Sequence, residues 1–308
     1  MRVRVLVNPK AGSGSAARRL PAILAEFEQA GANAEAAETR GPGDAARLVD
    51  EARRDGVDCI AVVGGDGTFN EVTQAFLGPA GEPVEGPPLG IVPSGTGGDF
   101  RRTFGLGTTT EEAVARIMAS PPRAVDLGVL ELTQPDGVRV TRAFANIMSF
   151  GIGGLTDRIV SRGPKWLGGR AAFLLGTLRA MAVYRNSPVR VVVDGQVLFE
   201  GPAFNVAVAN GRFFGGGMKI APDADPTDGV FDVVVLGDLS RARSVSLSRH
   251  IYRGTHLATA GVVCGRGQEV RAEPLANSTE VLIDMDGETP GRLPLRARIA
   301  PAALRIRI

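Results

Sequence analysis

Short apolar runs and helical patterns alternate along the first half of the chain. The run Val3–Val7 predicts a strand, and the segment after it carries Leu20, Ile23 and Phe27 at the three- and four-residue spacing of a helix. A second helical pattern follows and ends at Gly56, which is a typical stop signal. This part of the chain therefore begins with strands and helices in turn.

Two further apolar runs continue this alternation. Cys59–Val63 is uninterrupted, as in a strand buried on both faces, and Leu89–Pro93 follows after another predicted helix. Thr110 then has the position of a helix cap, with acidic residues in the first turn after it. Because strands and helices alternate, the first half of the chain predicts a parallel sheet flanked by helices.

From about Asp126 the pattern changes to strands that follow one another closely. Asp194-Gly195 lies between two apolar runs and predicts a hairpin, and one helical pattern, Arg170–Tyr184, interrupts the strands. The strand-like segments are 138–151, 188–201, 203–211, 229–238 and 280–288. We therefore expect an α/β domain over 1–126 and a mainly antiparallel β domain over 127–295.

Composition limits the classes of function. Hydrophobic residues make up 44% of the 308 residues and charged residues 22%, as in a soluble protein. A net charge of +2, without basic residues interleaved with aromatics, argues against a nucleic-acid partner. Two cysteines are too few for a disulfide framework or a cysteine metal site. The longest apolar stretch, Ala171–Val183, is too short to span a bilayer, so we expect a cytoplasmic protein, at most peripheral to the membrane.

Three turns that follow predicted strands are rich in glycine and polar residues. They are Asn8–Gly14, Gly64–Glu71 and Pro93–Phe100. In an open parallel sheet the carboxyl ends of the strands meet at one edge, where ligands bind, and glycine turns before helices bind phosphate. Tight packing of a strand on a helix explains one such turn equally well. Three together favour a phosphate site.

Carboxylates stand inside two of these turns, at Asp66 and Asp99, and Asp126 follows another strand-like run. A bare carboxylate repels a triphosphate, whereas Mg²⁺ binds carboxylate and phosphate oxygens together. We therefore predict that Asp66 and Asp99 hold a magnesium ion, with Asp126 as a third acid. This combination indicates phosphoryl transfer from a nucleotide.

Taken in order, the motifs resemble a known family. It is the diacylglycerol kinase catalytic-domain family of lipid kinases, which includes bacterial diacylglycerol kinases and the sphingosine and ceramide kinases. The resemblance covers nearly the whole chain, from Val3 almost to the C-terminus. The segments that carry it are "NPKAG" (8–12), "GGDGTFNEV" (64–72), "PSGTGGDF" (93–100), "GGGMKIAPDADPTDGVFDV" (215–233) and "DGE" (286–288).

This resemblance implies a first domain like the nucleotide domain of 6-phosphofructokinases and NAD kinases, to which 296–308 returns. It implies that Asp66, Asp99 and Asp126 organise magnesium and water around the phosphates. The residues it assigns to ATP are Asn8, Pro9, Lys10, Ala11, Gly12, Thr39, Gly64, Gly65, Asp66, Gly67, Thr68, Asn70, Glu71, Thr96 and Asp99.

The third turn departs from the family pattern. The family commonly has Ala-Asn before the aspartate, whereas this chain has Gly97 and Gly98. Loss of the asparagine side chain would loosen nucleotide contacts at this turn. Because Thr96 and Asp99 are retained, we still expect ATP to bind.

The acceptor hydroxyl needs a base, and "DMDGETPG" supplies three carboxylates. Alternation along an extended segment puts Asp284, Asp286 and Glu288 on one side, although a hairpin turn with solvated acids explains the same pattern. By resemblance, Glu288 is the proton acceptor and Asp286 its partner. The two histidines, His250 and His256, lie near a predicted β segment and are expected to be surface or packing residues.

A second metal site is implied by resemblance in the segment "PDADPTDGVFDV". The Asp228 side chain and the backbone carbonyl groups of Asp225 and Val230 would bind a structural magnesium ion there. A plain Asp-Gly turn is the alternative.

The expected function is that of a magnesium-dependent, ATP-dependent lipid kinase that meets its substrate at a membrane surface and has the capacity to form a homodimer. The sequence leaves the acceptor open among diacylglycerol, phosphatidylglycerol, a sphingoid base and a polyprenol. An NAD kinase, which also uses a "GGDGT" turn, and a non-catalytic nucleotide- or lipid-binding protein of the same fold are the alternatives.

Overall fold

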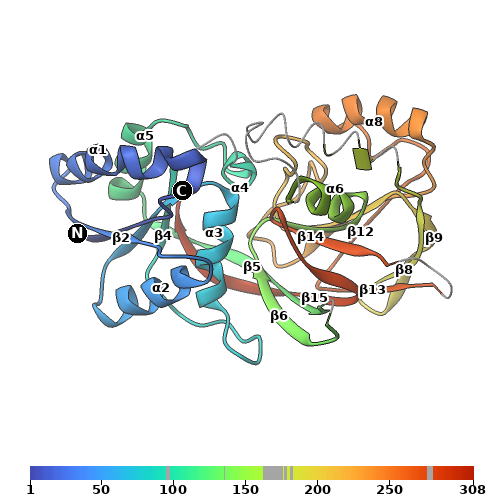
Figure 1. The fold of residues 1–308 in the computed structure, drawn as a ribbon, viewed down its shortest axis with the longest axis horizontal. Coiled ribbons are helices and arrows are strands. Elements are labelled where there is room, and N and C mark those ends of the chain that lie inside the picture. The colour runs from blue at the N-terminus through green and yellow to red at the C-terminus, as the bar shows by residue number, and fades with distance from the viewer. Residues whose placement is uncertain (95–97, 135, 162–175, 177–178, 181–182, 276–279) are drawn as a thin grey trace. The chain divides into compact units, whose positions relative to one another are not determined.

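The computed structural model describes the chain except for residues 95–97, 135, 162–175, 177–178, 181–182 and 276–279 (Figure 1). It divides into two compact units. The first unit comprises Met1–Leu127 and Ala300–Ile308, and the second comprises Gly128–Ile299. The chain passes between the units twice, within strands β5 (Pro122–Thr133) and β15 (Glu288–Arg307).

The first unit is built on a parallel sheet. The strand order is β4-β3-β1-β2, and the end of β15 lies beside β4, with Ile306 opposite Leu89. The elements of this unit are β1 Arg2–Val7, η1 Ala11–Gly14, α1 Ser15–Gln29, β2 Asn33–Glu38, α2 Asp44–Arg54, β3 Cys59–Gly64, α3 Asp66–Thr73, η2 Gln74–Phe76, β4 Leu89–Pro93, α4 Asp99–Thr103 and α5 Thr110–Ala119.

Helices cover both faces of this sheet. On one face, Val5 and alternate residues of β1 and β3 pack with Ile23 and Phe27 of α1 and Ile117 of α5. On the other face α2 and α3 pack against each other, as Figure 1 shows. The parallel, helix-flanked sheet predicted for the first half is thus confirmed.

Two details of this unit differ from the sequence-based prediction. The cap of α5 is Thr109, whose hydroxyl accepts the Glu112 N–H at 3.2 Å, while Thr110 is the first helical residue. Strand β2 was not predicted, because only Ala37 of its six residues is buried and, among the described strands, β1 is its one partner at the sheet edge. An edge strand of this composition has little of the β signal that buried strands carry.

The second unit is an antiparallel β sandwich. One layer runs β12-β11-β10-β7-β14-β15, and the other contains β13, β8 and β9. The elements are β6 Arg139–Phe144, β7 Ile147–Gly151, α6 Ile152–Ser161, β8 Ser187–Val193, β9 Gln196–Ala203, β10 Asn205–Ala209, β11 Phe231–Leu236, α8 Arg241–Arg253, β12 Val262–Gly267, β13 Glu269–Pro274 and β14 Leu282–Met285. The predicted antiparallel β domain is confirmed.

Its core lies between the two layers. Phe150, Val206 and Val233 from one layer meet Val191 and Val270 from the other, and all five side chains are buried. The predicted hairpin joins β8 to β9 at Asp194-Gly195, where both residues have positive φ, 46° and 80°. This backbone suits Asp-Gly because few other residue pairs adopt it without strain.

Two helices of the second unit were not expected. Helix α6 follows β7 directly, and α8 packs Leu247 and Ile251 on the outer surface of the sandwich. His250 therefore lies on a helix, which corrects its predicted place near a β segment. Most of the expected helical pattern Arg170–Tyr184 lies outside the described residues. Among the described helices, none is long and apolar enough to cross a bilayer.

Candidate active site

The carboxyl ends of β1, β3 and β4 lie side by side in the first unit. β1 and β3 are adjacent and parallel with Val7 opposite Val63, and β3 and β4 are adjacent with Gly64 opposite Pro93. The three glycine-rich turns begin at the ends of these strands. They therefore start from one edge of the sheet, where ligands of open α/β sheets bind.

Ser94 links the three turns. Its N–H donates to the Gly64 carbonyl at 3.1 Å, which joins the third turn to the second. Its hydroxyl lies 3.4 Å from the hydroxyl of Ser15, the first residue of α1, which joins the third turn to the first. Sequence reasoning did not identify Ser94, because a serine beside a glycine is common in any turn.

The Asp66 carboxylate caps the first turn of α4. Its Oδ2 accepts the N–H groups of Gly98 and Asp99 at 2.8 and 2.9 Å, and its Oδ1 accepts the Phe100 N–H at 3.1 Å. The first N–H groups of a helix have no partner within the helix, and a carboxylate there is stabilised by their partial positive charge. Asp66 thus fixes the third turn from a position on the second.

Two positions in these turns require glycine, each for a different reason. One leaves no room for a side chain, and the other has a backbone conformation that favours glycine. A Cβ on Gly64 would lie 2.5 Å from the Thr68 hydroxyl oxygen, so strand β3 and helix α3 approach each other too closely for alanine. Gly98 has φ of 108°, in the region that glycine adopts most readily. The glycine that departs from the family pattern at position 98 therefore matches its backbone; Gly97 and Thr96 lie outside the described residues.

The other predicted ATP residues surround the same strand ends. Thr39 is 5% exposed, and its N–H donates to the Val7 carbonyl at 3.0 Å. Glu71 accepts the Gly43 N–H at 2.6 Å and so ties α3 to the start of α2. Asn70 is buried and accepts a hydrogen bond from the Gln74 side chain at 2.8 Å.

The first turn after β1 is held by its asparagine. The Asn8 carbonyl accepts the Ala11 N–H at 2.9 Å, and the Asn8 side chain accepts the Lys10 N–H at 3.0 Å. Gly12 lies within this turn with φ of 57°. These contacts shape the loop that precedes α1, whose N-terminal N–H groups lie next to it.

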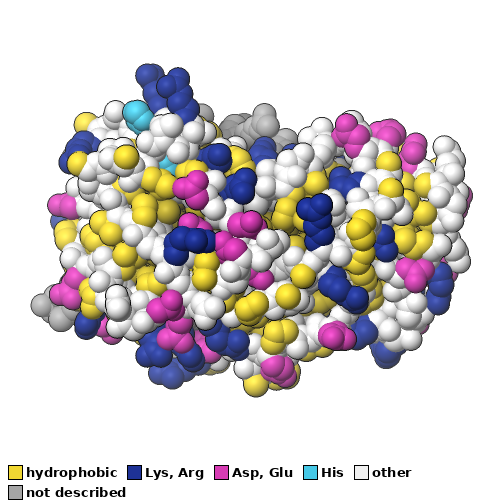
Figure 2. Space-filling view, turned by 180° about the vertical axis from the view of Figure 1, so that it is seen from behind, with side chains coloured by type: hydrophobic (Ala, Val, Ile, Leu, Met, Phe, Trp, Pro, Cys, Tyr) yellow, Lys and Arg dark blue, Asp and Glu magenta, His cyan; other side chains and the backbone are white. Residues whose placement is uncertain are grey.

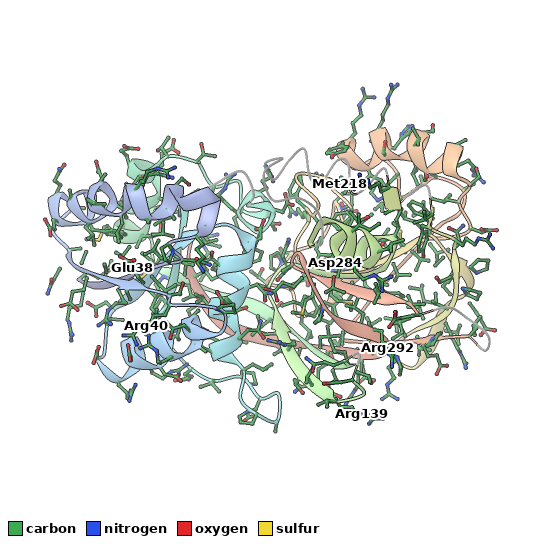
Figure 3. All side chains as sticks on the ribbon, viewed as in Figure 1. Glu38, Arg40, Arg139, Met218, Asp284 and Arg292 are labelled. Carbon is green, nitrogen blue, oxygen red and sulfur yellow. The ribbon has the colours of Figure 1, made fainter. Side chains whose placement is uncertain are left out.

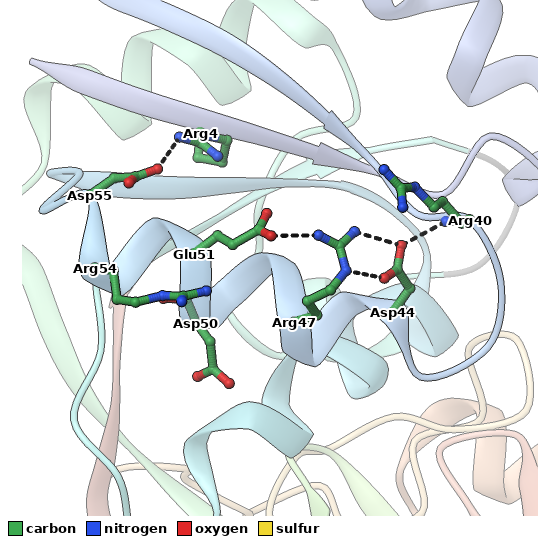
Figure 4. A network of polar contacts seen from close by, with 8 residues as sticks. All are labelled: Arg4, Arg40, Asp44, Arg47, Asp50, Glu51, Arg54 and Asp55. Carbon is green, nitrogen blue, oxygen red and sulfur yellow. Dashed lines mark hydrogen bonds and ion pairs between the residues drawn. The ribbon is translucent and has the colours of Figure 1, made fainter.

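A charge network stabilises α2 beside Thr39 (Figure 4). The Asp44 carboxylate accepts the Arg40 N–H at 2.8 Å and is paired with Arg47, which also contacts Glu51 at 2.6 Å. The hydrogen bond from Arg47 is the main cause that lowers the pKa of Asp44 to about 2. The loop that carries Thr39 is thus connected to α2 through Arg40.

The other two predicted magnesium residues of the first unit have partners of their own. Asp99 is 6% exposed and forms an ion pair with Arg102 one turn along α4. Asp126 is 3% exposed and accepts the Ala302 N–H at 2.7 Å, where Ala302 has a positive φ of 55°. Within the described part of the chain, no three Asp, Glu, His or Cys side chains cluster closely enough to hold a metal ion by themselves.

Arg101 is a charged residue that sequence reasoning missed. It is 9% exposed, and its Nε–H has no hydrogen-bond partner among the described residues. Burial lowers the pKa of this guanidinium, although the Asp66 and Asp99 carboxylates oppose the shift. Its place on α4, next to Gly98 of the third turn, puts a positive charge beside the predicted phosphate site. The sequence signal was only a pair of arginines after "GGDF".

The acids predicted as base lie at the hairpin between β14 and β15. Asp286 and Gly287 form its turn, with φ of 49° and 88°, so the three acids do not line one side of an extended segment as alternation predicted. The Asp286 carboxylate accepts the N–H groups of Ala145 and Ile147 at 3.2 and 3.0 Å. Glu288 opens β15 and is exposed.

Asp284 belongs to the same hairpin (Figure 3). It accepts the Ser149 hydroxyl at 3.2 Å and the Gly287 N–H at 3.1 Å, and so braces the turn. Because Asp286 and Asp284 both bind backbone or hydroxyl donors, the turn holds its backbone in one conformation. The start of β15, where Glu288 lies, is therefore held in a fixed position by the turn.

The segment predicted as a second metal site forms a compact turn. The Asp228 N–H donates to the Asp225 carbonyl at 3.3 Å, and the Asp228 carboxylate accepts the Val230 N–H at 3.2 Å. Arg266 forms an ion pair with the same carboxylate. Because of this ion pair, a cation at Asp228 would compete with Arg266. Burial is the largest cause of the raised pKa of the neighbouring Asp232.

Both halves of the chain match models of known protein families. Residues 2–130 match the model described as the diacylglycerol kinase catalytic domain, and residues 146–308 match the YegS C-terminal NAD kinase beta sandwich-like domain. A diacylglycerol kinase of Bacillus subtilis is 30% identical over 296 residues, which cover 95% of this chain and 91% of the relative.

Solved structures agree with this assignment. A putative diacylglycerol kinase from Bacillus anthracis superposes with a TM-score of 0.76 at 25% identity, covering 99% of this chain and 94% of that one. An NAD kinase from Archaeoglobus fulgidus in complex with ATP superposes with a TM-score of 0.53 at 14% identity, covering 99% and 92%, and so shares the fold. The chain belongs to the diacylglycerol kinase catalytic-domain family of ATP-dependent lipid kinases.

Proposed function

We propose that this protein transfers the γ-phosphate of ATP to the hydroxyl group of a diacylglycerol-like lipid, with a bound magnesium ion and a carboxylate base. The observation that carries the proposal is the joining of three glycine-rich turns at one sheet edge by Ser94 and Asp66. Turns that are held rigidly keep their N–H groups oriented before the phosphates arrive, and such preorganisation is a large part of phosphoryl-transfer catalysis.

The first unit supplies the nucleotide site in this proposal. Backbone N–H groups of the turns Asn8–Gly14 and Gly64–Glu71 bind phosphate oxygens at the N-termini of α1 and α3. Arg101 adds positive charge at the third turn. Thr39, which directly follows β2, and Glu71, which lies within α3, line the part of the site that receives the rest of the nucleotide.

The three carboxylates of the first unit are suited to a magnesium ion that keeps most of its bound water molecules. Asp66 has three of its roughly four acceptor positions occupied by N–H groups, and Asp99 and Asp126 have partners as well. Mg²⁺ commonly binds through one or two carboxylates and several waters, so these residues would hold it through its water shell. When bound, the ion neutralises charge on the phosphates. The Asp228 carboxylate, with the Asp225 and Val230 carbonyl groups, is the proposed second site.

Glu288 is the proposed base. Its exposed carboxylate accepts the proton of the attacking hydroxyl, while Asp286 holds the hairpin through the Ala145 and Ile147 N–H groups. A positioned carboxylate of this kind contributes about 10²- to 10⁴-fold to the rate. The acceptor is proposed to come from a membrane surface, which the protein visits from the cytoplasm.

The test is phosphate transfer from γ-labelled ATP and Mg²⁺ to mixed micelles that contain diacylglycerol, phosphatidylglycerol, sphingosine or a polyprenol, with NAD also present. Organic extraction separates the products. Label in the organic phase supports the proposal, and chromatography identifies the acceptor. Label in aqueous NADP would instead support an NAD kinase, and nucleotide binding without any transfer would support a silent binding protein.

A further inference from the structure

Arg101 holds a buried guanidinium group beside the third glycine-rich turn. On the face of the molecule in Figure 2, exposed Lys and Arg side chains are interspersed with Asp and Glu side chains. Arg101 differs from them because only 9% of the residue is exposed and its Nε–H has no hydrogen-bond partner among the described residues. A buried donor without a partner costs free energy, which a bound water or ligand offsets.

Two backbone carbonyl groups fix the orientation of this guanidinium. Its Nη1 donates to the Leu106 carbonyl and, at 3.3 Å, to the Gly107 carbonyl. The edge formed by Nε and Nη2 faces Gly98, since a Cβ built on Gly98 would lie 2.9 Å from Nε and 3.5 Å from Nη2. Paired N–H groups on one edge of a guanidinium bind two oxygens of a phosphate at once. The edge that suits phosphate therefore faces the third turn.

Gly98 leaves free the place that this edge occupies. The family commonly has asparagine at this position, and the Cβ of that asparagine would meet the guanidinium at a distance that Cβ atoms in proteins essentially never show. Asparagine at position 98 and Arg101 in its present place thus exclude each other. In this chain the amide is absent, and the guanidinium stands where the amide side chain would begin.

The charge of Arg101 favours an anion over a water molecule as the missing partner. An arginine stays charged at every physiological pH. Burial lowers the pKa of Arg101 in spite of the nearby Asp66 and Asp99 carboxylates, so these acids compensate its charge incompletely. Both acids have other partners, since Asp66 accepts the N–H groups of 98–100 and Asp99 pairs with Arg102. Water would accept the Nε–H but leave the charge as it is, whereas an anion does both.

We propose that the Nε–Nη2 edge of Arg101 binds a phosphate group of the nucleotide directly, in place of the asparagine side chain that the family commonly has at position 98. Gly98 and Arg101 act as a pair, in which glycine provides the room and arginine provides the donors. This inference rests on the proposed nucleotide site and deepens it by naming the atoms that bind phosphate at the third turn. A charged, two-pronged donor replaces a neutral amide, so the phosphates contribute a large share of the ATP affinity of this chain.

The first test compares ATP with adenosine, which has no phosphate. Binding to the full-length protein is measured by calorimetry for ATP with Mg²⁺ and by ligand-observed NMR for adenosine. Arg101→Gln should weaken ATP binding by about 10- to 150-fold, the usual contribution of hydrogen bonds to a charged group, and leave adenosine binding nearly unchanged. A purely structural loss would weaken both ligands alike. Arg101→Lys keeps the charge but not the paired donors, and should recover only part of the loss.

Arg307 provides the matched control at the other end of the sheet. Its Nη1 also donates to two backbone carbonyl groups, those of Ile117 and Ser120, at 3.2 and 2.7 Å. It lies opposite Gly90 near the amino end of β4, whereas the third turn begins at the carboxyl end of that strand. Arg307→Gln should therefore lower the urea midpoint of unfolding as Arg101→Gln does, without changing the ratio of the ATP and adenosine dissociation constants.

A double-mutant cycle tests whether residues 98 and 101 share one place. Gly98→Asn puts a side chain on a backbone with φ of 108°, and because this strain is present whichever residue stands at 101, it cancels in the cycle. In the unmodified chain the substitution should weaken ATP binding, since its Cβ displaces the guanidinium. In the Arg101→Ala chain it should weaken binding less, or strengthen it. The two effects should differ by about 2- to 150-fold, the usual range for side chains in contact.

Several results would overturn the phosphate contact. They are unchanged ATP affinity in the Arg101→Gln variant, an equal loss of ATP and adenosine affinity, full recovery with lysine, and additive effects in the cycle. The proposed function fails on a different observation. ATP binding without phosphate transfer to any lipid contradicts the proposed function alone, whereas lipid phosphorylation with unchanged ATP affinity in the Arg101→Gln variant contradicts the contact alone.

Discussion

Replacement of Asp66 by asparagine tests the structural role found for this acid. The native carboxylate accepts three N–H groups, two on one oxygen and one on the other. Asparagine has one acceptor oxygen, so if it faces Gly98 and Asp99, its NH₂ group must face the Phe100 N–H. The hydrogen bond from the Phe100 N–H is then lost, and the other two have an uncharged acceptor in place of a carboxylate.

The expected cost follows from these contacts. Hydrogen bonds to a charged group contribute about 1.5–3 kcal/mol each, against about 1 kcal/mol for neutral ones. Because Asp66 is only half-buried, the lower part of this range applies: one lost bond costs about 1.5–2 kcal/mol and each of the two weakened bonds about 0.5–1 kcal/mol. Together they lower the stability of the third turn by about 2.5–4 kcal/mol. This is less than the usual total of about 5–15 kcal/mol, so the first unit should stay folded.

Hydrogen exchange of the amides 98–100 measures this loss locally. A loss of about 2.5–4 kcal/mol corresponds to a fall in protection of roughly 60- to 1,000-fold. The matched control is Asp58→Asn, because the exposed Asp58 carboxylate accepts the Arg2 N–H at 2.7 Å but touches no helix N-terminus. Unchanged protection in the Asp66 variant, together with lost phosphate transfer, would refute the capping role and leave only a metal role.

Three further predictions concern other sites. Glu288→Gln should lower kcat by about 10²-fold or more with little change in ATP affinity, as measured by steady-state rates and nucleotide titration, and an equal fall in both would indicate a structural role. Gly64→Ala should destabilise the first unit by about 1–3 kcal/mol in urea unfolding, because its Cβ meets the α3 threonine at 2.5 Å, whereas Gly65→Ala meets nothing within 4 Å and should be nearly neutral. The pKa of Asp44 is about 2 in the folded state, below its unfolded value of about 3.9, so its stabilisation is present above pH 4 and is lost as the pH falls toward 2. NMR titration of Asp44 should show this midpoint, and Arg47→Gln should raise it; an unchanged midpoint would contradict the pairing.

Buried elements and tight turns were predictable from the sequence. Strand β3 carries an uninterrupted apolar run because both of its faces are covered, and Asp194-Gly195 determines its hairpin through local backbone preference. Both signals lie within a few residues of the feature that they predict. The three glycine-rich turns, which follow the ends of β1, β3 and β4, were located for the same reason.

Elements defined by distant contacts were not predictable in this way. Helix α8 contains Val245 and Tyr252, which resemble strand residues, but Ser240 caps its start and Gly254, with φ of 70°, follows its end. These two signals could have identified the helix. The position of β2 depends on pairing with β1 at an edge, which leaves almost no pattern in its own residues.

The candidate site shows the same limit. The sequence placed Asp66 in a glycine turn and suggested a metal ligand, but the N–H groups that it accepts belong to residues more than thirty positions away. Likewise, Asp286 could not be seen to bind Ala145 and Ile147 across the second unit. Side-chain types indicate which chemistry is available, whereas the partners of a side chain follow only from the fold.

Hydrogen exchange of the full-length protein, with and without ATP and Mg²⁺, tests most directly the claim that three turns form the nucleotide site. We predict that ATP slows exchange of the amides in Asn8–Gly14, Gly64–Glu71 and 98–100 together, while the loop at Asp228 responds to Mg²⁺ alone. Protection at only one turn, or only at segments outside these three, would contradict the account, because the contacts of Ser94 and Asp66 hold the three turns together.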